Sequence, residues 1–194
     1  ALYIDEQLGR LTAEQLDGYI AELQRIPEMI ESMLAHRENI QFFASRYFNA
    51  EDMYFIGRNV DYAASLEASL KLKEISYIHS EAYAAGELKH GPISLIEDGT
   101  LVIALATDSR LFDKMMSNIK EVKARGAVVL GLATEDKTEI AAQTDMVFYV
   151  PKISAFMLPS LSVIPMQLFA YYVASMKGCD IDKPRNLAKS VTVE

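Results

Sequence analysis

Short apolar runs recur along the chain between residues 53 and 150. Four of these runs are nearly uninterrupted, at 53–56, 100–107, 127–133 and 146–150, and we expect the mixed segment 79–83 to add a short fifth strand. Uninterrupted apolar runs bounded by turn residues are typical of strands that are buried on both faces of a sheet. The sequence therefore predicts five short β-strands.

Longer segments with apolar residues at helical spacing separate these runs. The spacing predicts helices over 62–77, 111–123 and 161–176, and a short helical segment over 139–142. Strands that alternate with helices form parallel sheets with helices on both faces. We therefore expect an α/β fold, a three-layer αβα sandwich around a five-stranded parallel sheet. Open sheets of this kind bind ligands at the carboxyl ends of their strands.

The first fifty residues also have a helical pattern. Thr12, followed three positions later by Gln15, is typical of a capped helix start. Apolar residues at helical spacing predict one helix over 16–34, which we expect Pro27 to kink or to end, and a second helix over 37–47.

Changes in composition divide the chain into three parts. A helical arm covers residues 1–50, and the alternating strands and helices cover 51–178. Residues 179–194 have an early proline, few large apolar side chains and no helical period. Tails of this kind are often frayed chain ends. We expect one α/β domain with a helical N-terminal arm and an extended C-terminal tail.

Composition narrows the classes of function. A net charge of −8 argues against broad binding of nucleic acids, which needs basic patches, but leaves room for one small anionic substrate. The single cysteine, Cys179, excludes a disulfide framework, so we expect a cytoplasmic protein. The charge-free stretch between Lys152 and Lys177 contains prolines, serines and tyrosines, which favours a buried helix over a membrane span.

Titratable residues gather in the stretch 71–92. It holds three lysines, three glutamates and two of the chain's three histidines. Glu74 either forms a surface ion pair with Lys71 or acts as a general base in a cleft. His90, followed by Gly-Pro, is either a hydrogen-bonded turn residue or a proton carrier near neutral pH. The local pattern alone favours the ion pair and the turn residue, and His79 is interpreted as structural.

Other chemistry has less support in the sequence. The histidines and the cysteine have no spacing typical of metal ligands, so we expect no metal site and no cofactor. A lysine could form a Schiff base with a carbonyl, but the pattern does not select one. The first strand runs into residues 57–60, which hold neither a glycine-rich loop nor a run of hydroxyls and therefore have little capacity to bind phosphate.

Two separated stretches resemble one enzyme family. Residues 71–92, from Lys-Leu-Lys-Glu-Ile-Ser-Tyr to His-Gly-Pro, and the tail at 184–194, Pro-Arg-Asn-Leu-Ala-Lys-Ser-Val-Thr-Val-Glu, closely resemble the isomerase portion of the glutamine–fructose-6-phosphate aminotransferases, or glucosamine-6-phosphate synthases. The stretch 55–58 is also similar, although Asn59 stands where this family usually has glycine. The similarity extends over essentially the whole chain.

The resemblance implies a fold and a reaction. The fold would be the second of two tandem sugar isomerase (SIS) domains. The family opens fructose 6-phosphate, captures it as a lysine imine, aminates it with glutamine-derived ammonia and shifts a proton between C1 and C2. Glu74 would be the base for this shift, and Lys71 would assist it. Lys189 would form the imine, with Ala188 beside it lining the sugar. His90 would assist ring opening and reach the site of the neighbouring subunit.

The same resemblance implies partners outside this chain. The family has an N-terminal glutaminase domain and a first SIS domain whose hydroxyl-rich loops hold the sugar phosphate, and residues 1–4 look like the end of that domain's last helix. We interpret the chain as the C-terminal portion of a homodimeric synthase, with little or no activity by itself. The alternatives are a non-catalytic SIS-fold module that binds sugar phosphates or regulates, and a related sugar-phosphate isomerase or deglycase.

Overall fold

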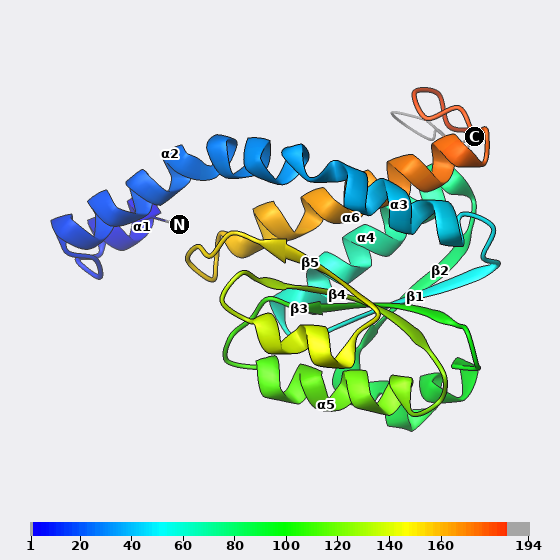
Figure 1. Cartoon of the computed structure of the whole chain (residues 1–194). Coiled ribbons are helices and arrows are strands. Elements are labelled where there is room, and N and C mark those ends of the chain that lie inside the picture. The colour runs from blue at the N-terminus through cyan, green and yellow to red at the C-terminus, as the bar shows by residue number, and fades with distance from the viewer. Residues whose placement is uncertain (1, 186–194) are drawn as a thin grey trace, which may run out of the picture.

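The structure, a computed structural model, describes residues 2–185 and is organised around one parallel sheet (Figure 1). The sheet has the strand order β2-β1-β3-β4-β5, and neighbouring strands are parallel throughout. The strands are β1 (Asp52–Gly57), β2 (His79–Ala84), β3 (Leu101–Ala106), β4 (Val128–Thr134) and β5 (Met146–Val150). The predicted five-stranded parallel sheet is confirmed, and the fifth strand expected at 79–83 is β2 at one edge.

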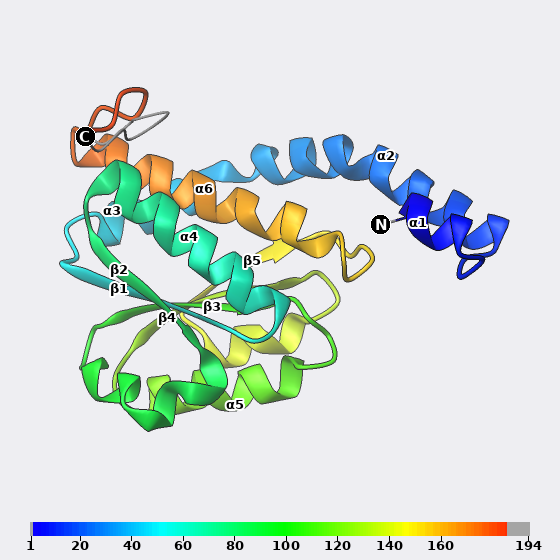
Figure 2. The same ribbon diagram turned by 180° about the vertical axis from the view of Figure 1, so that it is seen from behind.

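Helices cover both faces of the sheet. The α-helices are α1 (Leu2–Gln7), α2 (Ala13–Ala35), α3 (Arg37–Tyr47), α4 (Val60–Ser76), α5 (Phe112–Lys123) and α6 (Leu158–Met176), and the 3₁₀ helices are η1 (Ala85–His90), η2 (Pro92–Leu95) and η3 (Thr138–Gln143). α3, α4 and α6 lie on one face, and α5 lies with the 3₁₀ helices on the other (Figures 1 and 2). The three-layer arrangement expected from the sequence is therefore confirmed.

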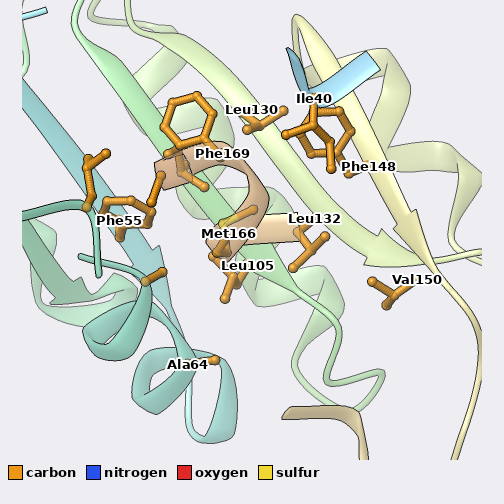
Figure 3. Close-up of a cluster of buried hydrophobic side chains, with 14 of the residues drawn as sticks. Ile40, Phe55, Ala64, Leu105, Leu130, Leu132, Phe148, Val150, Met166 and Phe169 are labelled. Atoms are coloured by element: carbon orange, nitrogen blue, oxygen red, sulfur yellow. The ribbon is translucent and has the colours of Figure 1, made fainter. Parts of the chain in front are cut away.

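The sheet divides the hydrophobic core into two clusters. Successive residues of a strand point to opposite faces. In β1, Phe55 belongs to the cluster under α4 and α6, whereas Tyr54 and Ile56 belong to the cluster that faces α5. Figure 3 shows the first cluster, in which Phe169 of α6 lies among side chains from the strands, such as Leu130. Burial on both faces is the physical reason for the uninterrupted apolar runs.

α6 contains most of the charge-free stretch. Leu161, Phe169 and Val173 of this helix are completely buried against the sheet and its neighbours. Within residues 2–185, no helix combines the length and the apolar character that crossing a membrane requires. The apolar composition of α6 thus serves the core of the domain.

The helical arm extends beyond the sheet through α1 and the first part of α2 (Figures 1 and 2). Thr12 caps α2 as predicted: its Oγ1 accepts a hydrogen bond from Gln15 N at 3.2 Å, and Gln15 Oε1 accepts one from Thr12 N at 2.9 Å. The expectation that Pro27 could end this helix is wrong, because α2 continues to Ala35. A proline removes one backbone donor, and the other hydrogen bonds of a long helix can hold it together.

A tight turn joins β1 to α4. A Cβ on Gly57 would lie 2.4 Å from the backbone of Asp61, so only glycine fits at this position. Asn59 follows with φ +53° and ψ −121°, a positive-φ conformation that residues with a side chain rarely adopt and glycine adopts without strain. The turn thus forms here with an asparagine.

Candidate functional site

Three charged side chains meet near the C-terminal end of α4. Lys71 Nζ donates a hydrogen bond to Glu74 Oε2 at 2.7 Å and lies 3.7 Å from Glu67 Oε1. The contact between Lys71 and Glu74 that the spacing indicated is therefore present. The Glu74 side chain is 47% exposed, so its carboxylate is open to a molecule that approaches from solvent.

Lys71 is held in its charged form. The hydrogen bond to Glu74 is the main reason that the pKa of Lys71 lies above its ordinary value, and it outweighs partial burial, which lowers that pKa. A carboxylate can accept a proton, and an adjacent ammonium can stabilise negative charge that develops nearby. The pair thus has the chemistry of a general base with a neighbouring cation.

The segment after α6 returns to this end of α4. Cys179 Sγ lies 4.0 Å from the carbonyl oxygen of Ser76, and Arg185 N donates a hydrogen bond to Tyr77 Oη at 2.9 Å. The Arg185 guanidinium also lies over the Tyr77 ring, with Cζ 3.6 Å from the ring centroid. The tail thus makes three contacts with Ser76, the last residue of α4, and with Tyr77, its C-cap.

These contacts place Arg185 against Tyr77, which lies close to Glu74 in the sequence. Tyr77 follows Glu74 by three residues. Arg185 precedes Ala188 by three residues and Lys189 by four. Ala188 and Lys189 themselves lie outside the described residues, so their predicted roles remain predictions.

The Lys71–Glu74 pair lies at the edge of the sheet where the strands begin. α4 runs back from the end of β1 to the start of β2, so its last turn comes just before His79. In Figure 1 this is the side on which α6 ends and the C-terminus is marked. The pair therefore does not lie at the carboxyl ends of the strands, where ligands usually bind in such sheets.

A buried polar network joins the carboxyl ends of β1 and β3. Asp61, which is 2% exposed, accepts hydrogen bonds from the backbone N–H of Thr107 at 2.8 Å and of Asp108 at 3.0 Å, and from the Thr107 hydroxyl. Burial raises the pKa of Asp61, although these hydrogen bonds oppose the shift. Successive backbone N–H groups often bind anions. Here a carboxylate of the chain itself occupies them.

Asp108 forms further contacts near the carboxyl end of β3. Its carboxylate accepts hydrogen bonds from Arg110 Nε at 2.9 Å and from Asn59 Nδ2 at 3.3 Å. The hydrogen bonds from Arg110 are the main reason that the pKa of Asp108 lies below its ordinary value. At the carboxyl ends of β1 and β3, the N–H groups of Thr107 and Asp108 and the Asp108 carboxylate thus already have partners within the chain.

His90 lies in a different layer from Glu74. It is the last residue of η1, whose Ala85 and Leu88 belong to the cluster facing α5, whereas α4 packs on the opposite face. Its Nδ1 lies 2.7 Å from Glu87 Oε2, and its side chain is 73% exposed. A carboxylate at Nδ1 orients the ring and favours a proton on that nitrogen. The structure therefore does not bring His90 and Glu74 together within one chain.

His79, the first residue of β2, contacts Asp52, the first residue of β1. Its Nδ1 lies 2.5 Å from Asp52 Oδ1, and the two residues are register partners in β2 and β1. The side chain is 58% exposed. This edge contact fits the structural role expected from the sequence.

Two cavities lie away from these residues. One of about 430 Å³ is lined by α2, α3, β5 and α6, and one of about 490 Å³ lies at the amino ends of β1 and β3. Lys71, Glu74 and His90 line neither of these two cavities. Across residues 2–185, no group of three His, Cys, Asp or Glu side chains is placed to hold a metal ion.

Sequence reasoning missed three residues that make these arrangements. Glu87 lies three residues before His90, and this spacing could have indicated their contact. Tyr77 and Arg185 are 108 positions apart, and no local pattern relates them. Their contact could be found only from the fold.

Known proteins of similar sequence share one domain type. The family model described as SIS domain matches residues 46–177. The chain is 55% identical over 194 residues to the glutamine–fructose-6-phosphate aminotransferase [isomerizing] of Clostridium tetani and 53% identical over 193 residues to that of Clostridium acetobutylicum. Each match covers 100% of this chain and 32% of the relative, so the chain spans about a third of the length of these curated relatives.

Solved structures agree with this assignment. One described as the C-terminal domain of glucosamine-fructose-6-phosphate aminotransferase from Francisella tularensis aligns with a TM-score of 0.88 at 35% identity, over 94% of this chain and 51% of that chain. Glucosamine-6-phosphate deaminase from Thermotoga maritima shares the fold, with a TM-score of 0.68 at 24% identity over 98% of this chain and 53% of that chain. From its parallel sheet, its helical layers and the match over 46–177, the chain belongs to the SIS domain family.

Proposed function

We propose that the chain supplies the isomerase chemistry of an enzyme that converts fructose 6-phosphate and glutamine-derived ammonia to glucosamine 6-phosphate. The observation that carries this proposal is identity of 53% and 55%, over the whole chain, to two relatives named glutamine–fructose-6-phosphate aminotransferase [isomerizing]. Similarity of this extent supports a common substrate class as well as a common fold.

Glu74 is the general base in this proposal. Its carboxylate takes a proton from C1 of the aminated sugar and returns a proton at C2. The step is a proton shift within the sugar, and no electrons pass to a cofactor. Two features support the role: the carboxylate is partly exposed, and the Lys71 ammonium lies 2.7 Å away. Lys71 would stabilise the negative charge that develops on the sugar while the proton is being moved.

Lys189 is the nucleophile. Its amine would attack the C2 carbonyl of open-chain fructose 6-phosphate and form an imine with loss of water, and ammonia would then replace the lysine at C2. Ala188 would line the sugar beside it. The supporting feature is the anchoring of Arg185, four residues earlier, on the Tyr77 side chain.

His90 assists ring opening and serves the site of the neighbouring subunit in a homodimer. Its exposure and its Glu87 partner suit a proton carrier that acts at a surface. Its position in the layer opposite α4 supports a role in a site other than that of Glu74 in the same chain.

The phosphate of the sugar would be held by a first SIS domain, and ammonia would come from a glutaminase domain. These parts would belong to the other two thirds of the relatives' length. The crevice at the ends of β1 and β3 supports this division, because the Asp61 carboxylate occupies the N–H groups that a phosphate would use.

Borohydride trapping tests the imine. The full-length enzyme is incubated with fructose 6-phosphate, borohydride reduces the imine to a stable amine, and mass spectrometry locates the adduct. We expect the adduct on Lys189 in the wild type and its loss in Lys189→Ala. Lys183→Ala, which removes another lysine of the tail, should trap as the wild type does. An undiminished adduct in Lys189→Ala would show that another lysine is the nucleophile.

A further inference from the structure

Tyr77 has two separate contacts with the segment that follows α6. Its hydroxyl accepts a hydrogen bond from Arg185 N at 2.9 Å, and its ring lies under the Arg185 guanidinium at 3.6 Å. The first contact holds the main chain, and the second holds the side chain. Together they fix both the position and the direction of the chain at Arg185.

The path from α6 to Tyr77 is also ordered by hydrogen bonds. Cys179 N donates to the carbonyl oxygen of Ala174 at 3.0 Å. Asp180 Oδ1 then accepts hydrogen bonds from Asp182 N at 3.1 Å and Lys183 N at 2.9 Å, which is the pattern of a turn held by an aspartate side chain. The segment therefore reaches Tyr77 along a defined course, seen above the ends of α4 and α6 in Figure 2.

Tyr77 itself has a conformation that aromatic residues rarely adopt. It ends α4 with φ +61° and ψ +16°, and its N–H donates to the carbonyl oxygen of Lys73 at 3.2 Å. Glycine or asparagine is the usual residue in such a left-handed helix end. Strained backbone conformations persist only where the surrounding structure holds them, and the contacts of Tyr77 with Arg185 are part of that surrounding structure.

We propose that Tyr77 is a positioning residue that anchors the C-terminal tail at the Glu74 end of α4. The consequence for the reaction rests on the proposed function, in which Lys189 forms the imine. From Arg185, Lys189 is four residues away, so the chain can extend at most about 14 Å. From the end of α6 at Met176 it is thirteen residues away, and the limit would be about 45 Å.

The anchor therefore raises the local concentration of the lysine. A tail fixed at Arg185 confines the Lys189 amine to a smaller volume than a tail fixed only at the end of α6. A smaller accessible volume raises the effective concentration of the amine.

Limited proteolysis measures the anchor in this chain directly. Trypsin cleaves after arginine, and Arg185 must leave the Tyr77 ring before its side chain can enter the protease. We expect cleavage of the 185–186 bond to be about tenfold faster in Tyr77→Leu and about threefold faster in Tyr77→Phe, which loses only the hydroxyl. Tyr62→Leu, at the other end of α4, should leave the rate unchanged, and cleavage after exposed Arg10 serves as the internal reference.

The variants keep the proposal falsifiable. Leucine and phenylalanine keep the same backbone strain as tyrosine at φ +61°, and circular dichroism checks that each variant is folded. Tyr77→Phe keeps the ring volume, so it decides the matter if Tyr77→Leu does not fold. A wild-type rate of cleavage at 185–186 in folded Tyr77→Leu, or in Tyr77→Phe if only that variant folds, would overturn the anchor.

The full-length enzyme tests the consequence for catalysis. In Tyr77→Leu we expect kcat and the rate of borohydride trapping at Lys189 to fall about three- to tenfold, with KM for fructose 6-phosphate within about twofold of wild type. Absence of trapping in the wild type would overturn the proposed function and leave the proteolysis result standing. Normal trapping in a variant whose tail is released would overturn the positioning role alone.

Discussion

Glu67 and Glu74 have similar immediate surroundings but different distances from the tail. Both contact Lys71, and their side chains are 42% and 47% exposed. Glu74 is three residues from Tyr77, whereas Glu67 is ten residues away, which is about 15 Å along a helix axis. Lys71 Nζ lies 2.7 Å from Glu74 but 3.7 Å from Glu67. In the proposed function, the shorter contact and the position nearer the tail favour Glu74 over Glu67 as the base.

Asn59 permits a prediction about strain at a single residue. Asn59→Gly and Asn59→Ala both remove the amide that contacts Asp108, but only alanine keeps a Cβ at φ +53°. We expect Asn59→Ala to be less stable than Asn59→Gly by about 1–3 kcal/mol, because glycine adopts this conformation without strain. Urea unfolding of the two variants measures the difference. Equal unfolding free energies would mean that the turn relaxes and is not strained.

The sequence indicated the contact of Lys71 with Glu74, but it missed that of Glu87 with His90 and the contacts between distant residues. Lys71 and Glu74 are three apart on a helix, so their spacing alone predicts the contact. The contact of Tyr77 with Arg185 depends on where α6 ends relative to α4, which only the packed structure determines. The left-handed conformation of Tyr77 was also missed, since aromatic residues seldom adopt it.

At the scale of elements, the apolar pattern predicted the strands and most helices because burial on both sides of the sheet leaves a strong local signal. The edge strand β2 gave the weakest signal, and most of its residues are only partly buried. The 3₁₀ helix η1, which carries His90, was not predicted, because so short a helix has no full apolar period. The direction of α4 places the Lys71–Glu74 pair where the strands begin. The general rule that ligands bind at the carboxyl ends of the strands predicted the opposite edge of the sheet.

The β1–α4 turn and the arm offer a matched pair of glycine substitutions. A Cβ at Gly57 would overlap the Asp61 backbone, whereas a Cβ at Gly18, within α2, would meet nothing within 4 Å. Gly57→Ala should therefore lose at least about 2 kcal/mol of stability, and Gly18→Ala should gain about 0.5–1 kcal/mol. Thermal or urea unfolding measures both changes. A neutral Gly57→Ala would contradict the close approach of α4 to β1.

Asp145 connects α5 to β4 and gives a prediction for pH. Its carboxylate accepts hydrogen bonds from Lys123 Nζ at 2.7 Å and from Val129 N at 2.7 Å. Burial raises its pKa, but these interactions outweigh burial, so the pKa lies below the ordinary value of 3.8. The stability from this carboxylate is therefore present above pH 3.8 and is lost as the pH falls through the lowered folded-state pKa.

Unfolding free energies across the acid range test this dependence. Wild type should be more stable than Asp145→Asn above pH 4, and the two should converge as the pH falls well below the ordinary value of 3.8. In a Lys123→Met background the difference between them should be smaller, since one partner of the carboxylate is gone. A difference that stays constant from pH 6 to pH 2.5 would mean that the charge of Asp145 does not contribute.

At the scale of the whole molecule, the SIS domain holds its candidate residues on two opposite layers. α4 presents Glu74 on one layer, and η1 presents His90 on the other. At the carboxyl ends of β1 and β3, the Asp61 carboxylate accepts the N–H groups of Thr107 and Asp108. A single chain therefore offers parts of a site, which supports the proposal that further domains and a second subunit complete it.

The kcat of glucosamine 6-phosphate formation in full-length Glu74→Gln and Glu67→Gln tests the central claim most directly. Both substitutions remove one carboxylate that contacts Lys71 and keep the size of the side chain. We expect Glu74→Gln to lower kcat about 10³-fold, with imine trapping retained, because a general base contributes about 10²–10⁴ in rate. Glu67→Gln should stay within about threefold of wild type, as expected for a surface ion pair. Equal and small effects of the two substitutions would contradict the claim and leave Glu74 as the partner of a surface lysine.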